Sequence, residues 1–548
     1  MNFKESETAQ KLGGAYYTPE PIAHFLASWV NEISPDSILE PSCGDGAFVD
    51  AMAAKVPKLK RIVAVDIDRT ALGLAKEKVL NYSNKSLQTN LIEDDFLSYS
   101  FDAIANGEKF DAILGNPPFI RYQYLDKIFQ DRTERAFADS NLKFTKHTNA
   151  WVPFVIQSLR LLKPGGRLGM VIPTELMHVL HANSLRQFIL ANCKSVAVVH
   201  LEELFSEEVL QGVILLLCEK TTEKLGSEAL IAFPHANNRN LLNGHAAEFI
   251  NSMPYISSKG LDYKWMEGLL TPEEAGVYRD VQKLPGIKKF TDIADVDVGI
   301  VTGANKFFLV EDETIKKFDL QAFAYPMFGR SSHVRGVRMK LSDLSQNEKL
   351  GLPTNFLRFP SLPIDELPAG AQKYIRLGEQ EGLHTRYKCR IRTPWYVVPS
   401  VWAADVAMLK RAHNTPRLIC NEANAFTTDT AYRLTMLESD EPNTERFVWN
   451  FVNSLTALSA ELEGRHYGGG VIEMVPSEIE RLVVPYALGG KSELKVLDDQ
   501  YRNGMSVFEI LEAQDKITLE AVGVSVEQTK VLNAAWQRLK RRRQRDHT

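Results

Sequence analysis

The chain has 548 residues, of which 44% are hydrophobic and 24% are charged, and its formal net charge is −5. This length predicts two or three domains of a soluble globular protein with sizeable cores. The small net charge neither favours nor excludes nucleic acid as a partner, because a local basic face can coexist with an acidic remainder.

Cysteine usage and the N-terminus indicate the compartment. The five cysteines are scattered, with no CxxC and no paired spacing, and the first ten residues are polar. This pattern is typical of reduced cytosolic thiols, gives no zinc signature and predicts no signal peptide. No apolar run approaches the length of a membrane span. We therefore expect a cytoplasmic protein with no metal and no membrane association.

The first 220 residues alternate between strand-like and helix-like segments. Strands are expected at 36–40, 61–67, 110–115, 166–173, 195–201 and 212–219, with helices at 71–82 and 150–162 among them. Apolar strands that alternate with amphipathic helices predict an α/β domain whose parallel sheet is covered on both faces. Beyond about residue 225 the alternation ends, and we expect a change of domain near residue 245.

The first strand-to-helix turn carries glycines in "ILEPSCGDGAF", residues 38–48. Gly44 and Gly46 allow a tight turn and a close approach to a ligand, although the third glycine of a dinucleotide fingerprint is replaced by Val49. The next strand ends at Asp66, where an acidic side chain can hold ribose hydroxyls. Asp95 lies near the end of a third strand, and it could pair with an adenine. Together these features predict an adenosine-containing cofactor, and NAD stays possible at this point.

The fourth strand is followed directly by Asn116, Pro117, Pro118 and Phe119. An adenine amine is a poor nucleophile, and two acceptors aimed at its hydrogens would free its lone pair. The Asn116 side chain and the Pro117 carbonyl supply such acceptors, and the proline ring fixes the backbone. Phe119 offers a flat face to a base taken out of its helix. A rigid turn alone is the alternative, but its position after a nucleoside site favours methyl transfer to adenine.

These motifs resemble those of the gamma-class, TaqI-like and Eco57I-like, DNA adenine-N6 methyltransferases that use S-adenosylmethionine in restriction-modification systems. "GAYYTPEPIAHFLASW" resembles the N-terminal cofactor segment, and "VAVDID", "DDFL" and "NPPF" follow in the gamma order. The resemblance implies a Rossmann-like class I methyltransferase domain with a mostly parallel seven-stranded sheet, then a mixed α+β target-recognition domain and a helical tail.

The resemblance also implies site residues. The catalytic tetrad is Asn116, Pro117, Pro118 and Phe119. The cofactor would contact Tyr17, Thr18, Glu40, Pro41, Cys43, Gly44, Gly46, Asp66, Ile67, Asp95, Phe96 and Asn116. The flipped base would stack on Phe119 and on Phe205, for which a core role is an equal alternative.

The distal half carries a local basic excess. Nine Lys or Arg and three Asp or Glu lie between Ala371 and Arg417, with Tyr and Trp among them. Such groups bind phosphates, and Arg also reads guanine edges, although a solvated face is the ordinary alternative. We expect double-stranded DNA to contact Arg386, Lys388, Arg390, Arg392, Arg465 and His466. The basic end "KRRRQR" either adds phosphate contacts or is a frayed tail.

The expected domains are 1–245 for catalysis, 246–485 for target recognition and 486–548 as a helical extension with a basic end. Alternatives are an RNA adenine methyltransferase, a protein glutamine methyltransferase and a non-catalytic DNA-binding subunit. Neither end has room for a typical nuclease domain, so a separate restriction endonuclease is the expected functional partner.

Overall fold

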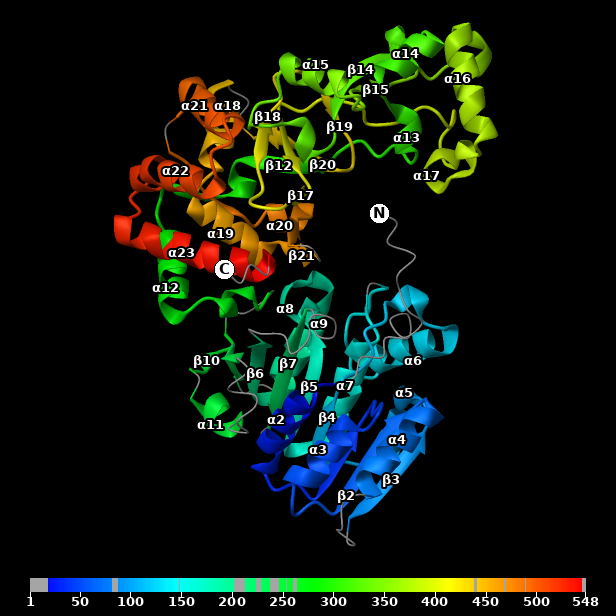
Figure 1. The fold of residues 1–548 in the computed structure, drawn as a ribbon, viewed down its shortest axis with the longest axis vertical. Helices are drawn as coiled ribbons and strands as arrows, with labels where there is room; N and C mark the ends of the chain where they lie inside the picture. The colour runs from blue at the N-terminus through cyan, green and yellow to red at the C-terminus, as the bar shows by residue number, and fades with distance from the viewer. Residues whose placement is uncertain are drawn as a thin grey trace. The chain divides into compact units, whose positions relative to one another are not determined.

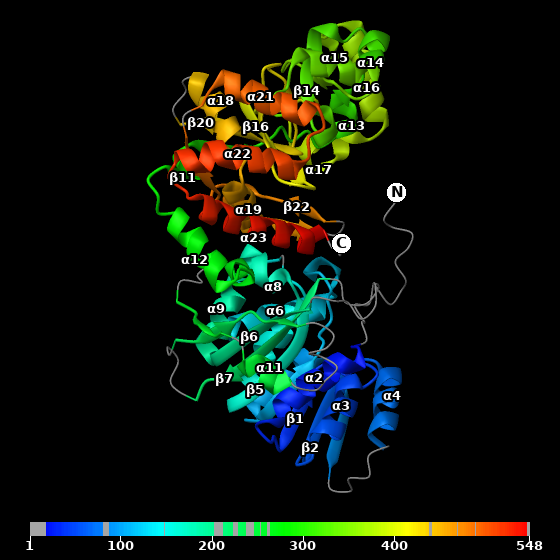
Figure 2. The same cartoon turned by 60° about the vertical axis from the view of Figure 1, so that its left-hand side comes forward.

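A computed structural model describes residues 18–80, 87–146, 148–201, 212–222, 228–236, 246–252, 254–259, 264–437, 441–467, 470–487 and 489–544. The chain divides into two compact units, Met1–Leu269 and Leu270–Thr548 (Figures 1 and 2). The change of domain expected near residue 245 therefore falls inside the first unit. The reason is that the segment after residue 245 belongs to the first sheet and its layers. Ile256 pairs with Ile231, and the helix α11 (Ala246–Asn251) packs on the helix α2 (Glu20–Asn31).

The first unit is built on one sheet of ten strands, counted over the described residues. Seven of them run in the order β3-β2-β1-β4-β5-β7-β6, with β7 antiparallel to both of its neighbours. The predicted seven-stranded sheet is thus extended, because β8 and β9 pair with β6 and β10 pairs with β8. The strands are β1 (Ser37–Glu40), β2 (Arg61–Asp66), β3 (Gln88–Glu93), β4 (Phe110–Gly115), β5 (Leu162–Pro173), β6 (Cys193–Leu201), β7 (Val213–Lys220), β8 (Leu230–Ala232), β9 (His235–Ala236) and β10 (Ile256–Ser257).

All six predicted strands are confirmed as β1, β2, β4, β5, β6 and β7. Their central residues are buried, as in β1 and in the middle of β2 and β7. Continuous burial explains why these segments are apolar runs instead of alternating patterns, since a parallel sheet is covered on both faces. β5 begins earlier than expected, because Leu162 already pairs with Phe110 of β4. A register shift separates that pair from the regular pairing, which in β5 starts at Arg167.

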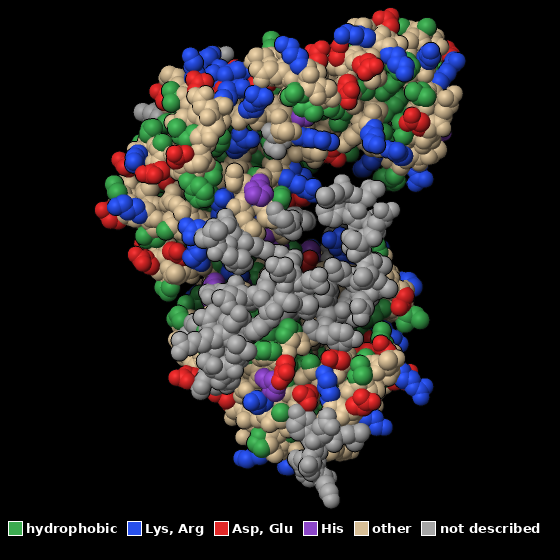
Figure 3. Space-filling view, in the orientation of Figure 1, with side chains coloured by type: hydrophobic (Ala, Val, Ile, Leu, Met, Phe, Trp, Pro, Cys, Tyr) green, Lys and Arg blue, Asp and Glu red, His purple; other side chains and the backbone are tan. Residues whose placement is uncertain are grey.

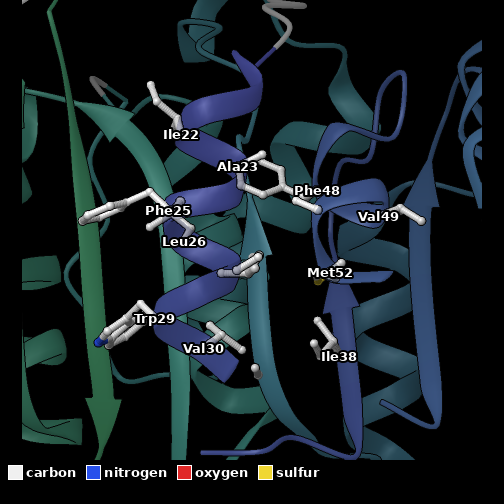
Figure 4. Packing of buried hydrophobic residues seen from close by; sticks show 14 of the residues in the cluster. Ile22, Ala23, Phe25, Leu26, Trp29, Val30, Ile38, Phe48, Val49 and Met52 are labelled. Atoms are coloured by element: carbon white, nitrogen blue, oxygen red, sulfur yellow. The ribbon is translucent and has the colours of Figure 1, made fainter. Parts of the chain in front are cut away.

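Helices cover both faces of the sheet (Figure 1). One layer holds α2 (Glu20–Asn31), α3 (Ala47–Lys55), α4 (Arg69–Leu80) and α11 (Ala246–Asn251). The other holds α5 (Phe96–Ala105), α6 (Lys127–Ala138), α7 (Trp151–Leu161) and α9 (Asn183–Asn192), while the short α8 (Glu175–His178) follows β5. Figure 4 shows the first layer, where Phe25, Leu26 and Val30 of α2 pack near Phe48 and Met52 of α3. This core fixes the segment that leads into α2 beside the carboxyl ends of β1 and β4.

The second unit combines small sheets with many short helices. Its sheets run β12-β20-β16-β18, β13-β15-β14-β19, β17-β22-β21 and β11-β23. The strands are β11 (Ile287–Lys289), β12 (Ala294–Val298), β13 (Leu309–Val310), β14 (Ala324–Phe328), β15 (Asn355–Leu357), β16 (Val406–Leu409), β17 (Arg411–Ala412), β18 (Leu418–Cys420), β19 (Phe426–Thr427), β20 (Ala431–Met436), β21 (Arg465–Tyr467), β22 (Val471–Glu473) and β23 (Val483–Pro485).

Helices of the second unit fall into two groups along the chain. The earlier ones are α12 (Pro272–Val281), α13 (Asn305–Phe308), α14 (Asp312–Phe318), α15 (Leu341–Lys349), α16 (Ala369–Gln380) and α17 (Tyr387–Arg390). The later ones are α18 (Glu441–Asn450), α19 (Ser454–Glu463), α20 (Pro476–Ile479), α21 (Lys491–Arg502), α22 (Val507–Ala521) and α23 (Val526–Gln544). The last helix packs along α19 and α12, so the C-terminal segment is part of this unit's core.

Candidate cofactor and target-base site

The glycine loop follows β1 and leads into α3. Gly44 and Gly46 both have positive φ, 47° and 81°, which favours glycine. The turn is closed by a hydrogen bond of 2.8 Å from the Gly46 amide to the Cys43 carbonyl. A Cβ on Gly46 would lie 2.7 Å from the Ala75 Cα in α4. Only glycine therefore lets α3 begin this close to α4, which leaves backbone amides at the carboxyl edge of the sheet.

Asp66 lies at the end of β2, next to this loop. Its Oδ2 accepts a hydrogen bond of 2.8 Å from the Gly44 amide, and its Oδ1 accepts one of 2.9 Å from the Asp68 amide. A carboxylate offers about four acceptor positions, so two ribose hydroxyls can still be accommodated. The neighbouring Ile67 is largely exposed, as expected of an apolar side chain that a ligand would cover. Asp66 therefore both shapes the glycine loop and fits the predicted cofactor role.

Glu40 ends β1 and is almost fully buried. Burial and the charge of Asp66 raise the pKa of Glu40 well above its ordinary value. Its Oε2 is buried without a hydrogen-bond partner among the described residues. Burial also raises the pKa of the neighbouring Cys43 thiol, which favours its neutral form. A buried acceptor at this edge fits a cofactor that brings a hydrogen-bond donor.

Asp95 and Phe96 follow β3 and begin α5. Asp95 caps the helix by accepting the Leu97 amide at 2.8 Å, and its other oxygen pairs with Arg132 at 2.6 Å. The Phe96 ring is buried, with its centroid 4.9 Å from that of Phe154. Both predicted cofactor residues thus have structural partners within the first unit, and their cofactor contacts stay predictions.

The Asn116-Pro117-Pro118-Phe119 segment directly follows β4, as predicted. The Asn116 side-chain amide donates to the Thr18 hydroxyl at 3.2 Å, and the Ser42 hydroxyl donates to the Asn116 carbonyl at 3.0 Å. A Cβ on Gly115 would lie 3.0 Å from the Pro41 ring. The structure therefore joins three predicted elements: the N-terminal segment, the glycine loop and the tetrad. Ser42 was missed by the sequence, because a loop serine carries no distinctive signal.

A second set of contacts that supports the tetrad, on the segment after Phe119, was also not predicted from the sequence. The chain beyond Phe119 pairs with 148–150 through its backbone. The Ala150 amide donates to the Ile120 carbonyl at 2.8 Å, and Arg121 and Asn149 form an isolated antiparallel β-bridge. The Asn149 side chain in turn donates to Glu175, which follows β5. Burial raises the pKa of Glu175, although Asn149 and Arg121 partly offset that effect. This network holds the chain on the far side of the tetrad.

Family comparisons agree with this geometry. The Eco57I restriction-modification methylase model matches residues 46–205, and the model of the C-terminal domain of the Type II methyltransferase M.Eco57I matches residues 262–519. The chain belongs to the Eco57I restriction-modification methylase family. It is a DNA methyltransferase with S-adenosylmethionine as its methyl donor.

Individual relatives are similar over most of their length. The Type II methyltransferase M.AccI of Acinetobacter calcoaceticus is 23% identical over 90% of this chain and 87% of its own. M.XamI of Xanthomonas campestris pv. amaranthicola is 21% identical over 86% and 85%. Among solved structures, the Type IIL restriction-modification enzyme MmeI in complex with DNA has a TM-score of 0.55 at 11% identity, over 95% of this chain and 75% of that one. That likeness concerns the fold.

The predicted DNA contacts of this methylase fall into two groups. Arg386, Lys388 and Arg390 are exposed around α17. The other three have partners within the second unit. The Arg392 guanidinium donates to the Val301 and Thr302 carbonyls, Arg465 pairs with Glu478 at 3.0 Å, and His466 lies 3.5 Å from Glu461. The second group therefore has structural roles, and its DNA contacts stay predictions.

Some predicted residues of the methylase lie outside the described ranges, namely Tyr17 and Phe205. Within those ranges, no group of three or more His, Cys, Asp or Glu side chains is placed to hold a metal ion. None of the described helices combines the length and hydrophobicity that a bilayer span requires.

Proposed function

We propose that the enzyme methylates the N6 amine of an adenine flipped out of double-stranded DNA at a specific site. The observation that carries this proposal is the fixed orientation of Asn116. Its amide nitrogen is directed at Thr18 and its backbone carbonyl is held by Ser42. The side-chain oxygen is the opposite end of the same planar amide, and it is suited to accept a hydrogen bond from an amine.

The chemistry follows from these acceptors. Bound S-adenosylmethionine supplies an electrophilic methyl group on its sulfonium. The Asn116 oxygen and the Pro117 carbonyl would accept the two N6 hydrogens and direct the nitrogen lone pair out of the ring. Phe119 would hold the base by stacking. As the carbon–nitrogen bond forms, the bond between the methyl carbon and the sulfonium sulfur would break, with its electron pair left on sulfur. The methylated nitrogen would then be cationic and would release a proton to water, so positioning and oriented dipoles carry the catalysis.

The first experiment is expression in a host without DNA methylation, followed by single-molecule sequencing. We expect N6-methyladenine at one recurring sequence. Tritiated methyl transfer to that mapped duplex then tests the site. Asn116→Ala should abolish or severely reduce transfer, while the Asn106→Ala control at the exposed end of α5 should retain it. Methyl groups on cytosine, on structured RNA or on a protein glutamine would contradict the proposal, and so would near-full turnover by Asn116→Ala.

We further propose that the part of 246–485 that lies in the second unit, residues 270–485, forms the target-recognition domain. We also propose that 486–548 extend this domain and that methylation protects DNA from a separate restriction endonuclease in the prokaryotic cytosol. The exposed cations around α17 support the recognition role. Plasmid DNA from the expressing host should resist an endonuclease that cuts the mapped sequence, and plasmid DNA from an Asn116→Ala strain should be cut.

A further inference from the structure

The turn around α17 exposes apolar side chains among cations. Tyr387 is 63% exposed and Ile391 is 61% exposed. They are four residues apart, and Ile391 at the end of the helix has nearly helical dihedrals, φ −85° and ψ 3°. Residues at this spacing lie on the same face of a helix. Together they form one exposed apolar pair, which we call the α17 pair.

Positive charge surrounds the α17 pair. Between Leu383 and Arg392 the sequence has four Lys or Arg and no Asp or Glu. The Lys388 ammonium and the Arg390 guanidinium each lie 5.6 Å from the centre of the Tyr387 ring. In the described part of the chain, no ion pair involves Arg386, Lys388 or Arg390. Lys and Arg side chains are visible at this end of the unit in the space-filling view (Figure 3).

The backbone beneath the α17 pair is held firmly. The Arg392 guanidinium donates to the Thr302 carbonyl at 2.7 Å and the Val301 carbonyl at 2.6 Å. Cys389 is buried, and its thiol lies 3.9 Å from the Thr302 carbonyl. Gly303 approaches so closely that a Cβ there would lie 2.7 Å from the Lys388 Cβ. The turn is therefore anchored on one side while its other side is presented to a partner.

This combination fits a nucleic-acid duplex. Phosphates complement the uncompensated cations, and apolar side chains that enter between base pairs are a common means of unstacking a step. We propose that Tyr387 and Ile391 insert into the bound DNA and unstack one base step, while Arg386, Lys388 and Arg390 contact phosphates beside it. This inference rests on the proposed function, since it concerns how the target duplex is held.

The test uses the full-length enzyme and the mapped duplex, with 2-aminopurine placed at successive positions outside the target adenine. Wild-type enzyme should increase the fluorescence at one step, and Tyr387→Ala combined with Ile391→Ala should remove that increase. Affinity should fall about 5- to 150-fold, which corresponds to ~1–3 kcal/mol for a lost stacking contact. Tyr387→Phe should retain both signals because the flat ring remains.

Two control variants distinguish insertion by the α17 pair from other effects on DNA binding. Leu350→Ala removes a side chain of the same unit that is 64% exposed, and it should change neither signal. Lys388→Ala should reduce the salt slope of binding by about 0.9, whereas the paired Tyr387 and Ile391 substitutions should leave the slope unchanged.

Several results would overturn the inference. One is a doubly substituted enzyme that binds and unstacks DNA like the wild type. Another is loss of self-association in sedimentation velocity with normal DNA binding, which would assign the α17 pair to a second copy of the chain. Absence of adenine methylation by the wild type would instead remove the proposed function.

Discussion

Replacing Arg543 with methionine is expected to destabilise the second unit strongly, although this residue belongs to a basic C-terminal run. Arg543 and Glu461 form a bidentate ion pair at 2.7 and 2.9 Å, with 0% and 2% of their side chains exposed. Arg543 also donates to the His413 and Asn414 carbonyls, each at 2.9 Å. Removing one partner of a buried pair leaves an uncompensated charge and costs about 3–5 kcal/mol.

The assay is thermal unfolding, followed by calorimetry and by a probe of the second unit. For a unit of this size about 1 kcal/mol corresponds to ~2 °C, so Tm should fall by roughly 6–10 °C. Arg541→Ala is the matched control, because Arg541 is exposed and bonded to Gln537. It should change stability by less than ~0.5 kcal/mol.

The dependence on pH provides a second test. Burial would raise the pKa of Glu461, but hydrogen bonds from His466 and Arg543 hold it below its ordinary value. A lowered folded-state pKa gives stability that is present above the unfolded-state pKa and lost as the pH falls through the folded-state value. Without Arg543 its share of this contribution is lost, while that of His466 remains. The difference between wild type and Arg543→Met should therefore be largest at neutral pH and should narrow in acid.

The reasoning would be refuted if Arg543→Met unfolded within about 1 °C of Arg541→Ala. A frayed, phosphate-binding tail would give that result, together with weaker DNA binding. Adding Glu461→Gln to Arg543→Met should recover part of the loss, because the buried charge is removed.

Two further predictions concern the cofactor loop. Asp66→Ala should weaken S-adenosylmethionine binding by roughly 1–3 kcal/mol in calorimetry, and unchanged affinity in a folded variant would remove Asp66 from the site. Gly46→Ala should lower stability by about 2–4 kcal/mol, since it combines a positive φ with a clash against Ala75. Gly107→Ala has a similar φ and open space, so an equal loss there in thermal unfolding would show that the Ala75 contact does not matter.

The strands and the order of motifs were predictable because each depends on local sequence. Apolar runs marked β1, β2, β4, β5, β6 and β7, and parallel pairing of β1, β2 and β4 places the polar residues after these three strands at one edge. The neighbourhood of Asn116 and Thr18 was implied only by the family resemblance, because Thr18 precedes the helix α2 and strand pairing does not place it.

Long-range side-chain pairs were not predictable. Arg132 reaches Asp95 across 37 residues, and Arg543 reaches Glu461 across 82. No local pattern distinguishes these residues from solvated charges. For the same reason the packing of Phe96 beside Phe154 was not predicted, while its contact with the cofactor stays a prediction. Its position after Asp95 is visible in the sequence, whereas its contact with Phe154 depends on where α7 packs.

The basic excess between Ala371 and Arg417 shows that a count of charges does not tell which cations are accessible to DNA. Five of its nine cations have partners within the unit: carboxylates for Arg376, Lys410 and Arg411, and backbone carbonyls for Arg392 and Arg417. Arg386, Lys388 and Arg390 form the exposed group around one turn, and Lys373 of α16 is exposed as well. Because only accessible cations release counterions from DNA, the salt dependence of binding should follow these four much more closely than the total. The sequence located the basic segment, and the packing of its neighbours decides which of its charges can meet a phosphate.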